Sequence, residues 1–132
     1  MDDFESGKPL EEIFRNGTLS IGFMGLSEAV EVLTGERFYE SHEANDVAIG
    51  LVGFMRSSID RFRKEEGLNF SLLATSGEFI SGRFPELDKQ VYKHPVNEKG
   101  FYTNSFHVNV DAGIHPFDKI RIEGPFHILC NH

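Results

Sequence analysis

The sequence predicts an α/β fold with parallel strands, and three features near its centre carry that prediction. Residues 18–23 alternate polar and apolar side chains, as a half-buried strand does. Residues 41–67 repeat apolar side chains at helical spacing, and residues 68–74 follow directly as a second strand. Alternating strands and helices of this kind are typical of parallel strands joined by crossover helices.

Cap and stop residues set the ends of the expected helices. Pro9 and Gly17 are suited to the first turn and the end of a short helix over residues 8–17. Ser27 is a candidate cap for a second helix, which we expect to end at Gly35. The N-terminal part of the chain is therefore predicted to run helix, strand, helix.

The long helix is the clearest element of the sequence. Ser41 can cap it and Gly67 can end it. Its apolar positions recur every three or four residues, and they are Val47, Ala48, Leu51, Val52, Met55, Ile59 and Phe62. We interpret this stripe as ordinary core packing.

The second half of the chain is less regular. Residues 75–78 break the strand pattern and start a short helical turn, which Pro85 interrupts. The elements expected after it are a resumed helix over 86–91, a polar loop over 94–100, a strand over 101–110, a helix or strand over 115–125, and a last strand over 126–130.

Length, composition and charge limit the function classes. The 132 residues suit one domain, 39% are hydrophobic, and the net charge is -8. The chain shows no basic stripe for nucleic acid, and no apolar run approaches the roughly 20 residues of a membrane span. Cys130 is the single cysteine, so an internal disulfide and a Cys-x-x-Cys zinc site are excluded. We expect a cytoplasmic protein without nucleic-acid, membrane or metal binding.

The first candidate site is Thr75, Ser76, Gly77 and Glu78, directly after the second strand. Ligands of open α/β sheets lie beyond the carboxyl ends of strands, and the free N–H groups of a helix start bind anions. Thr75 and Ser76 could therefore hold a nucleotide phosphate. The alternative is a plain helix cap with Glu78 completing a capping box, which needs no ligand.

The second candidate is the expected strand around Asn104. In a strand, Thr103, Ser105 and His107 share one face, and Asn104 and Phe106 share the other. A polar face is costly to bury unless partners or a ligand satisfy it, which suggests a pocket wall. A half-exposed edge strand explains the pattern equally well. Cys130 has no base nearby in sequence, so we favour a buried structural thiol over a nucleophile.

Taken together, the motifs resemble anaerobic (class III) ribonucleoside-triphosphate reductases, which are glycyl-radical enzymes. The matching stretches occur in that family's order with similar spacing, and they are residues 12–17, 18–26, 67–75, 102–108 and 119–125. The resemblance implies a fragment of a ten-stranded α/β barrel built around a finger loop. It implies reduction of ribonucleoside triphosphates to deoxyribonucleotides, with a glycyl radical made by an activase that uses S-adenosylmethionine and an iron–sulfur cluster. Formate as electron source, structural zinc and ATP or dNTP effectors are also implied.

The resemblance also assigns the candidate residues. Residues 75–78 match the family's Thr-Pro-Ala/Ser-Glu segment near the substrate phosphates, although Ser76 and Gly77 depart from it. Asn104, Ser105 and His107 match its Thr-Asn-Ser-Phe-His segment near the pocket, and we assign none of them a catalytic role. The finger-loop cysteine, the four-cysteine zinc site and the radical loop have no match in residues 1–132. We therefore expect an internal segment of the barrel, which associates through its open strand edges.

These expectations predict that the chain alone does not reduce ribonucleotides, because no residue in it matches the cysteine or glycine that carries the family's radical. The measurement is product formation from a ribonucleoside triphosphate with activase and formate. Turnover above the background without the chain would contradict the assignment. Two other readings remain: a stand-alone nucleotide-binding or interaction remnant, and a relative of the formate-lyase branch.

Overall fold

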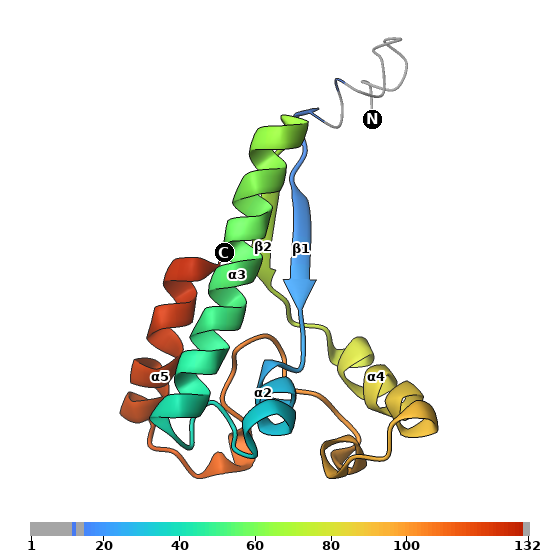
Figure 1. Cartoon of the computed structure of the whole chain (residues 1–132), viewed down its shortest axis with the longest axis vertical. Coiled ribbons are helices and arrows are strands. Elements are labelled where there is room, and N and C mark those ends of the chain that lie inside the picture. The colour runs from blue at the N-terminus through green and yellow to red at the C-terminus, as the bar shows by residue number, and fades with distance from the viewer. Residues whose placement is uncertain (1–11, 13–14, 131–132) are drawn as a thin grey trace.

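The computed structural model describes residue 12 and residues 15–130. Most of the helix expected over 8–17 lies outside these residues. A long helix stands beside two strands, and the remaining helices gather around the lower end of this unit (Figure 1). The fold is therefore a mixed one, in which helices surround one end of a small sheet.

The two strands expected over residues 18–23 and 68–74 form a parallel pair, and the sheet contains no further strand among the described residues. Strand β1 (Leu19–Phe23) pairs with β2 (Phe70–Ala74) in a register that places Leu19 opposite Phe70 and Phe23 opposite Ala74. Parallel pairing sends both carboxyl ends to the same end of the sheet, where α2 and α4 begin (Figure 1). Ligands of α/β sheets bind beyond this carboxyl end of the strands.

Helix α3 (His42–Glu66) makes the crossover between the strands and confirms the expected long helix. The Ser41 side chain accepts a hydrogen bond from the Ala44 N–H at 3.3 Å, and Gly67 ends the helix with a φ of 66°. The side chains buried along α3 recur at helical spacing and are Ala44, Ala48, Val52 and Ile59. A cap, a stripe and a stop therefore define this helix locally.

Helix α2 (Leu26–Thr34) begins two residues earlier than a Ser27 cap allows, so that prediction is wrong. Gly25, at a φ of 78°, turns the chain directly from the end of β1 into the helix. Left-handed backbone of this kind suits glycine. Ser27 consequently lies inside the first turn, where it is fully buried. Gly35 ends α2, as expected.

Helix α4 (Glu78–Val91) runs through Pro85 without a break, so the predicted interruption is wrong. A proline has no N–H and leaves the carbonyl four residues earlier without its helical partner. That carbonyl belongs to Ser81, and it accepts a hydrogen bond from the Tyr102 N–H at 2.8 Å. A distant segment thus replaces the missing bond. A short 3-10 helix (Pro95–Lys99) follows α4.

The strand expected over residues 101–110 does not form. Asn104 makes an isolated antiparallel bridge with Met24, and a turn and a 3-10 helix (Val110–Ala112) follow. Two buried carboxylates take the place of a neighbouring strand: the Thr103 N–H donates to Glu28 at 3.1 Å and the Val108 N–H to Glu123 at 2.8 Å. The strand predicted from the alternating side chains of this segment is therefore wrong.

Helix α5 (Pro116–Leu129) settles the ambiguous region as helical and replaces the strand expected over 126–130. His115 caps it and Pro116 occupies the first turn, a common start for a helix. Phe126 is fully buried, with ring centroids 5.5 Å from Phe38 and 5.3 Å from Phe106. This packing, which joins segments far apart in sequence, stabilises the C-terminal residues as a helix.

The core lies between α3, α5 and the strand ends. Its buried members come from α2, α3, β2, α5 and the segments between them, and they include Val30, Phe38, Val52, Leu72, Phe106 and Phe126. None of the described helices combines the length and apolar character that a bilayer span needs.

Substitution of Gly22 tests how closely β1 packs against Thr75, the residue that follows β2. A Cβ at this position would overlap the Thr75 hydroxyl oxygen and lie 2.9 Å from Thr75 Cβ. We expect Gly22→Ala to lower the free energy of unfolding by about 1–3 kcal/mol, as overpacking does. Urea unfolding measures this.

The matched control is Gly50→Ala, in open space on α3. Alanine favours a helix interior, so this change should raise stability by about 0.5–1 kcal/mol. Equal effects of the two substitutions would contradict the close approach of Gly22 and Thr75.

Candidate functional site

The candidate site lies where β1 and β2 end. After β1 the chain enters Met24 and Gly25, and after β2 it enters residues 75–77. Thr75 lies against Gly22, which has no side chain to keep it away. The segments that follow the two parallel strands thus lie side by side and form the site.

The structure brings the two expected groups of site residues together at one point. The Gly77 N–H, immediately before α4, donates to Asn104 Oδ1 at 3.1 Å. Asn104 is held in turn by its bridge to Met24, and the Gly25 N–H donates to the Thr103 carbonyl at 2.8 Å. Asn104 therefore connects the ends of both strands with the start of α4.

Glu28 anchors this turn, and sequence reasoning missed it. It is 4% exposed and accepts hydrogen bonds from the Thr103 N–H at 3.1 Å and the Thr103 hydroxyl at 2.7 Å. An acidic residue in a first helical turn normally looks like a partner of the helix dipole. No local signal could show that this one is buried against a segment 75 residues away.

Beyond the Gly77 N–H, which donates to Asn104, the start of α4 has no side-chain cap. Its N-cap residue is Gly77, and no side-chain cap hydrogen bond forms there. The capping box proposed for residues 75–78 is therefore wrong, and the Thr75 hydroxyl donates instead to the Leu73 carbonyl at 3.4 Å. Ser76 and Glu78 are exposed. First-turn N–H groups without a side-chain acceptor are suited to bind an anion.

Ser105 and His107 do not share a face with Thr103, because no strand forms. Ser105 is fully buried at a φ of 43°, and its hydroxyl has no hydrogen-bond partner among the described residues. Left-handed backbone at a non-glycine residue is strained and recurs at functional sites. His107 turns toward α5, where its Nδ1 lies 3.6 Å from Glu123 Oε1. Thus Asn104 approaches residues 75–78, whereas His107 contacts another helix.

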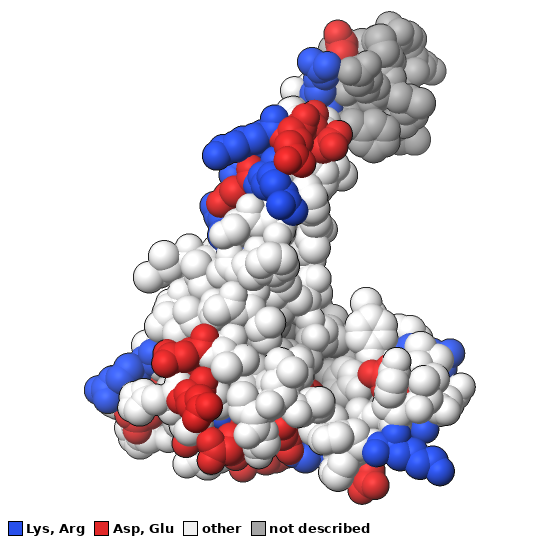
Figure 2. All heavy atoms as spheres, in the orientation of Figure 1, with Lys and Arg blue, Asp and Glu red and all other residues white. Residues whose placement is uncertain are grey.

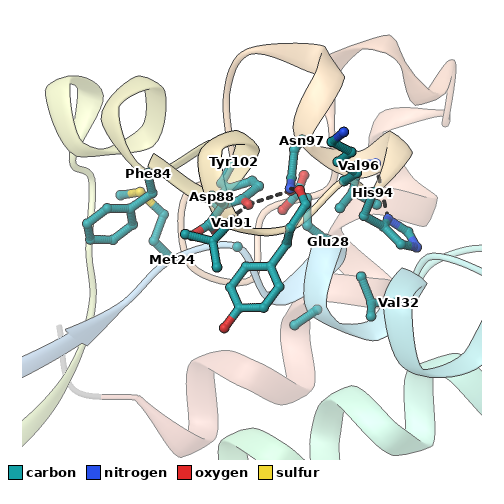
Figure 3. Close-up of a pocket in the computed structure, with 14 residues that line it drawn as sticks. Met24, Glu28, Val32, Phe84, Asp88, Val91, His94, Val96, Asn97 and Tyr102 are labelled. Atoms are coloured by element: carbon teal, nitrogen blue, oxygen red, sulfur yellow. Dashed lines mark hydrogen bonds between the residues drawn. The ribbon is translucent and has the colours of Figure 1, made fainter. Parts of the chain in front are cut away.

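A second feature is a pocket of about 730 Å³ between α2, the last turns of α4 and the 3-10 helix that follows (Figure 3). Glu28, Asp88, Asn97 and Tyr102 are among its polar lining residues, whereas Thr75 and Ser76 are not. The Tyr102 hydroxyl lies 2.6 Å from Asp88 Oδ2 and 2.7 Å from Asn97 Oδ1.

Ionisation is suppressed at Tyr102, on the pocket lining, and at Cys130, in the core at the end of α5. Burial, then the hydrogen bond and charge of Asp88, then the charge of Glu28 raise the pKa of Tyr102, so its phenol stays protonated and acts as a donor. Burial also raises the pKa of the Cys130 thiol, against a smaller opposing effect of Arg56. A buried, protonated thiol is a weak nucleophile, which agrees with a structural role for Cys130.

The Asn104 link generates a prediction for the start of α4. Asn104→Ala removes the acceptor of the Gly77 N–H and should cost about 1 kcal/mol of stability. Asn104→Asp keeps an acceptor, and its charge suits a helix start, so stability should be largely retained. Amide hydrogen exchange at Gly77 should accelerate in the alanine variant alone.

The control is Asn45→Ala, which removes another side-chain hydrogen bond, from Asn45 Nδ2 to the Phe38 carbonyl at 3.2 Å. It should lower stability without changing exchange at Gly77. Unchanged Gly77 exchange in Asn104→Ala would show that the link does not hold the start of α4.

Comparison with known proteins identifies the family. The family model for anaerobic ribonucleoside-triphosphate reductase matches residues 1–132. Proteins of that name from Salmonella typhimurium and Escherichia coli are 37% and 36% identical to this chain over 127 residues, covering 92% of it. The protein of enterobacteria phage T4 is 34% identical over 123 residues, covering 90% of the chain.

The match covers most of this chain but only a small share of its relatives' length. It spans 18% of the Salmonella and Escherichia proteins and 19% of the phage protein. The chain thus corresponds to less than a fifth of those reductases. Within that limit, the chain belongs to the anaerobic ribonucleoside-triphosphate reductase family.

Proposed function

We propose that this chain forms part of the substrate-binding barrel of an enzyme that reduces ribonucleoside triphosphates to deoxyribonucleotides. Family membership over residues 1–132 supports this, since the relatives are named for that reaction. The parallel β1–β2 pair with its crossover helix α3 is a unit from which α/β barrels are built.

The sheet has only two strands among the described residues, so each strand has one unpaired edge, and apolar side chains on its faces are also exposed. Leu19 and Ile21 on β1 are 36% and 41% exposed, and Leu73 on β2 is 36% exposed. Parallel sheets normally have both faces covered, and barrels leave no edge unpaired. We propose that further strands of a ten-stranded barrel pair with these edges, supplied by other parts of the enzyme or by another copy of this chain.

Within this barrel we propose that Thr75, Ser76, Gly77 and Glu78 bind the substrate's phosphates. Three observations support the proposal: the position beyond two parallel strand ends, the hydroxyls of Thr75 and Ser76, and the helix start that no side chain caps. The Asn104 link carries the most weight, because it joins the two segments that sequence reasoning selected separately. Ser105 and His107 belong to the proposed substrate-binding set through the family resemblance alone, since Ser105 is fully buried and His107 lies against Glu123.

The radical chemistry is proposed to come from other parts of the parent enzyme. The described residues do not fit a zinc or iron–sulfur site, because they contain no group of three His, Cys, Asp or Glu side chains that could hold a metal. Cys130 is buried and protonated, which does not suit a reacting thiol. We therefore assign the glycyl radical, zinc, formate, the effectors and the activase partner to the whole enzyme, in the cytoplasm, and no catalytic residue to this chain.

Calorimetric titration with a ribonucleoside triphosphate tests the phosphate site. We expect weak saturable binding that is lost in a Thr75→Ala, Ser76→Ala double variant, because the hydroxyl donors are removed. Asn104→Asp should weaken binding while the fold persists, because a carboxylate at this point repels phosphate. Ser57→Ala, which removes a hydroxyl from the exposed side of α3, is the matched control and should bind normally.

Inorganic triphosphate in place of the nucleotide separates recognition of phosphate from recognition of the nucleoside. Absence of heat at millimolar nucleotide, with the chain folded, would favour a non-catalytic remnant over a preserved site. Binding that the double variant leaves intact would place the phosphates elsewhere on the chain.

A further inference from the structure

The pocket between α2 and the end of α4 carries an inference separate from the phosphate site. It is lined partly by Glu28 and Asp88, so its polar groups suit a ligand of the opposite charge to phosphate. In Figure 3, Glu28, Asp88, Asn97 and Tyr102 lie on one side of the pocket, and apolar side chains such as Phe84, Val32 and Val91 line other parts of it.

The polar side of this pocket has more hydrogen-bond acceptors than donors. The Tyr102 hydroxyl has one proton, yet it faces two acceptors, Asp88 Oδ2 at 2.6 Å and Asn97 Oδ1 at 2.7 Å. One of the two amide hydrogens of Asn97 is already used, since Nδ2 donates to the Tyr92 carbonyl at 2.9 Å, and the Nδ2 atom cannot donate to the Oδ1 of its own amide. One acceptor around Tyr102 is therefore left without a proton at any moment.

Glu28 adds an independent observation. It is 4% exposed and lines the pocket, and its Oε1 has no hydrogen-bond partner among the described residues. Its other oxygen, Oε2, holds both donors of Thr103. A buried carboxylate is costly unless a positive charge or further donors compensate it. The described residues place no Lys, Arg or His within ion-pair distance of Glu28 or Asp88.

The lining suits an organic cation better than a metal ion. No three His, Cys, Asp or Glu side chains come together as metal ligands in the part of the chain that the structure describes. The apolar walls formed by Met24, Ala29, Val32 and Phe84 suit a short aliphatic chain. Lys93 also lies on the lining and makes no ion pair with either carboxylate among the described residues. Its ammonium group could compete with a bound cation, so a Lys93 variant is included in the test below.

We propose that this pocket binds an alkylammonium group, with the N–H donors directed to Glu28, Asp88 and Asn97 and the aliphatic stem against the apolar wall. Such a group occurs in a free alkylamine and in a lysine side chain of another protein segment. The recognition chemistry is the same for both sources.

Titration with n-butylammonium, followed by amide NMR shifts and calorimetry, tests the proposal. We expect saturable binding with shifts concentrated at Glu28, Asn97 and Tyr102. Tetramethylammonium carries the same charge without N–H donors and should bind about tenfold more weakly, since charge-assisted hydrogen bonds are lost. A capped tripeptide with central lysine distinguishes the sources: tighter binding than butylammonium indicates a protein side chain, and equal or weaker binding indicates a free amine.

Variants with opposite expected effects separate recognition from simple damage to the pocket. Glu28→Gln and Asp88→Asn should each weaken binding about tenfold, because each removes one charge-assisted hydrogen bond. Tyr102→Phe should strengthen it about threefold, since removal of the hydroxyl that now faces Asp88 and Asn97 frees two acceptors for the ligand. Lys93→Met should leave binding equal or tighter.

Glu86→Gln is the matched control, because it removes one negative charge from the exposed side of the same helix, where Glu86 pairs with Arg83. It should leave binding unchanged. Equal weakening by Glu86→Gln and Asp88→Asn, or equal affinity for tetramethylammonium, would reduce the effect to attraction by the net charge of -8. Weakening by Tyr102→Phe in a folded variant, or no saturable binding, would also overturn the proposal.

Discussion

The buried carboxylate of Glu28 is the contact on which both proposed sites depend. It accepts the backbone and side-chain donors of Thr103 and thereby fixes an irregular segment against α2. Tyr102 on one side of Thr103 reaches the carbonyl that Pro85 leaves free and the polar groups of the pocket. Asn104 on the other side reaches Gly77. One carboxylate thus positions the turn that joins the strand ends to both ends of α4.

This arrangement accounts for two sites of opposite character lying close together. The start of α4 presents backbone N–H groups without a side-chain cap, which favours an anion. The region near the end of α4 presents Asp88 with Glu28 behind it, which favours a cation. Charges are also unevenly distributed on the visible surface (Figure 2). Basic and acidic groups are mixed at the C-terminal end of α3, whereas acidic groups gather near α2 and the N-terminal end of α3. Both proposals therefore rest on local groups rather than on the net charge.

Local patterns predicted the elements that depend on local interactions. The Ser41 cap, the apolar stripe and Gly67 define α3 within its own residues, and the parallel pairing of β1 with β2 followed from the crossover. Residues 101–110 alternate like a strand, but buried carboxylates from α2 and α5 occupy their N–H groups instead of a neighbouring strand. Pro85 is tolerated because Tyr102, 17 residues further along, supplies the missing donor. Such partners are distant in sequence and leave no periodic signal.

The sequence by itself determined the family, the crossover unit and the two segments around Thr75 and Asn104, because motifs and helical periodicity are properties of consecutive residues. Only the tertiary structure decided that Gly77 and Asn104 touch, that His107 turns away to Glu123, and that Glu28 is buried. The physical reason is that burial and hydrogen-bond partnership are set by contacts between distant residues. An acidic residue in a first helical turn has the same local sequence whether it faces water or a buried backbone N–H.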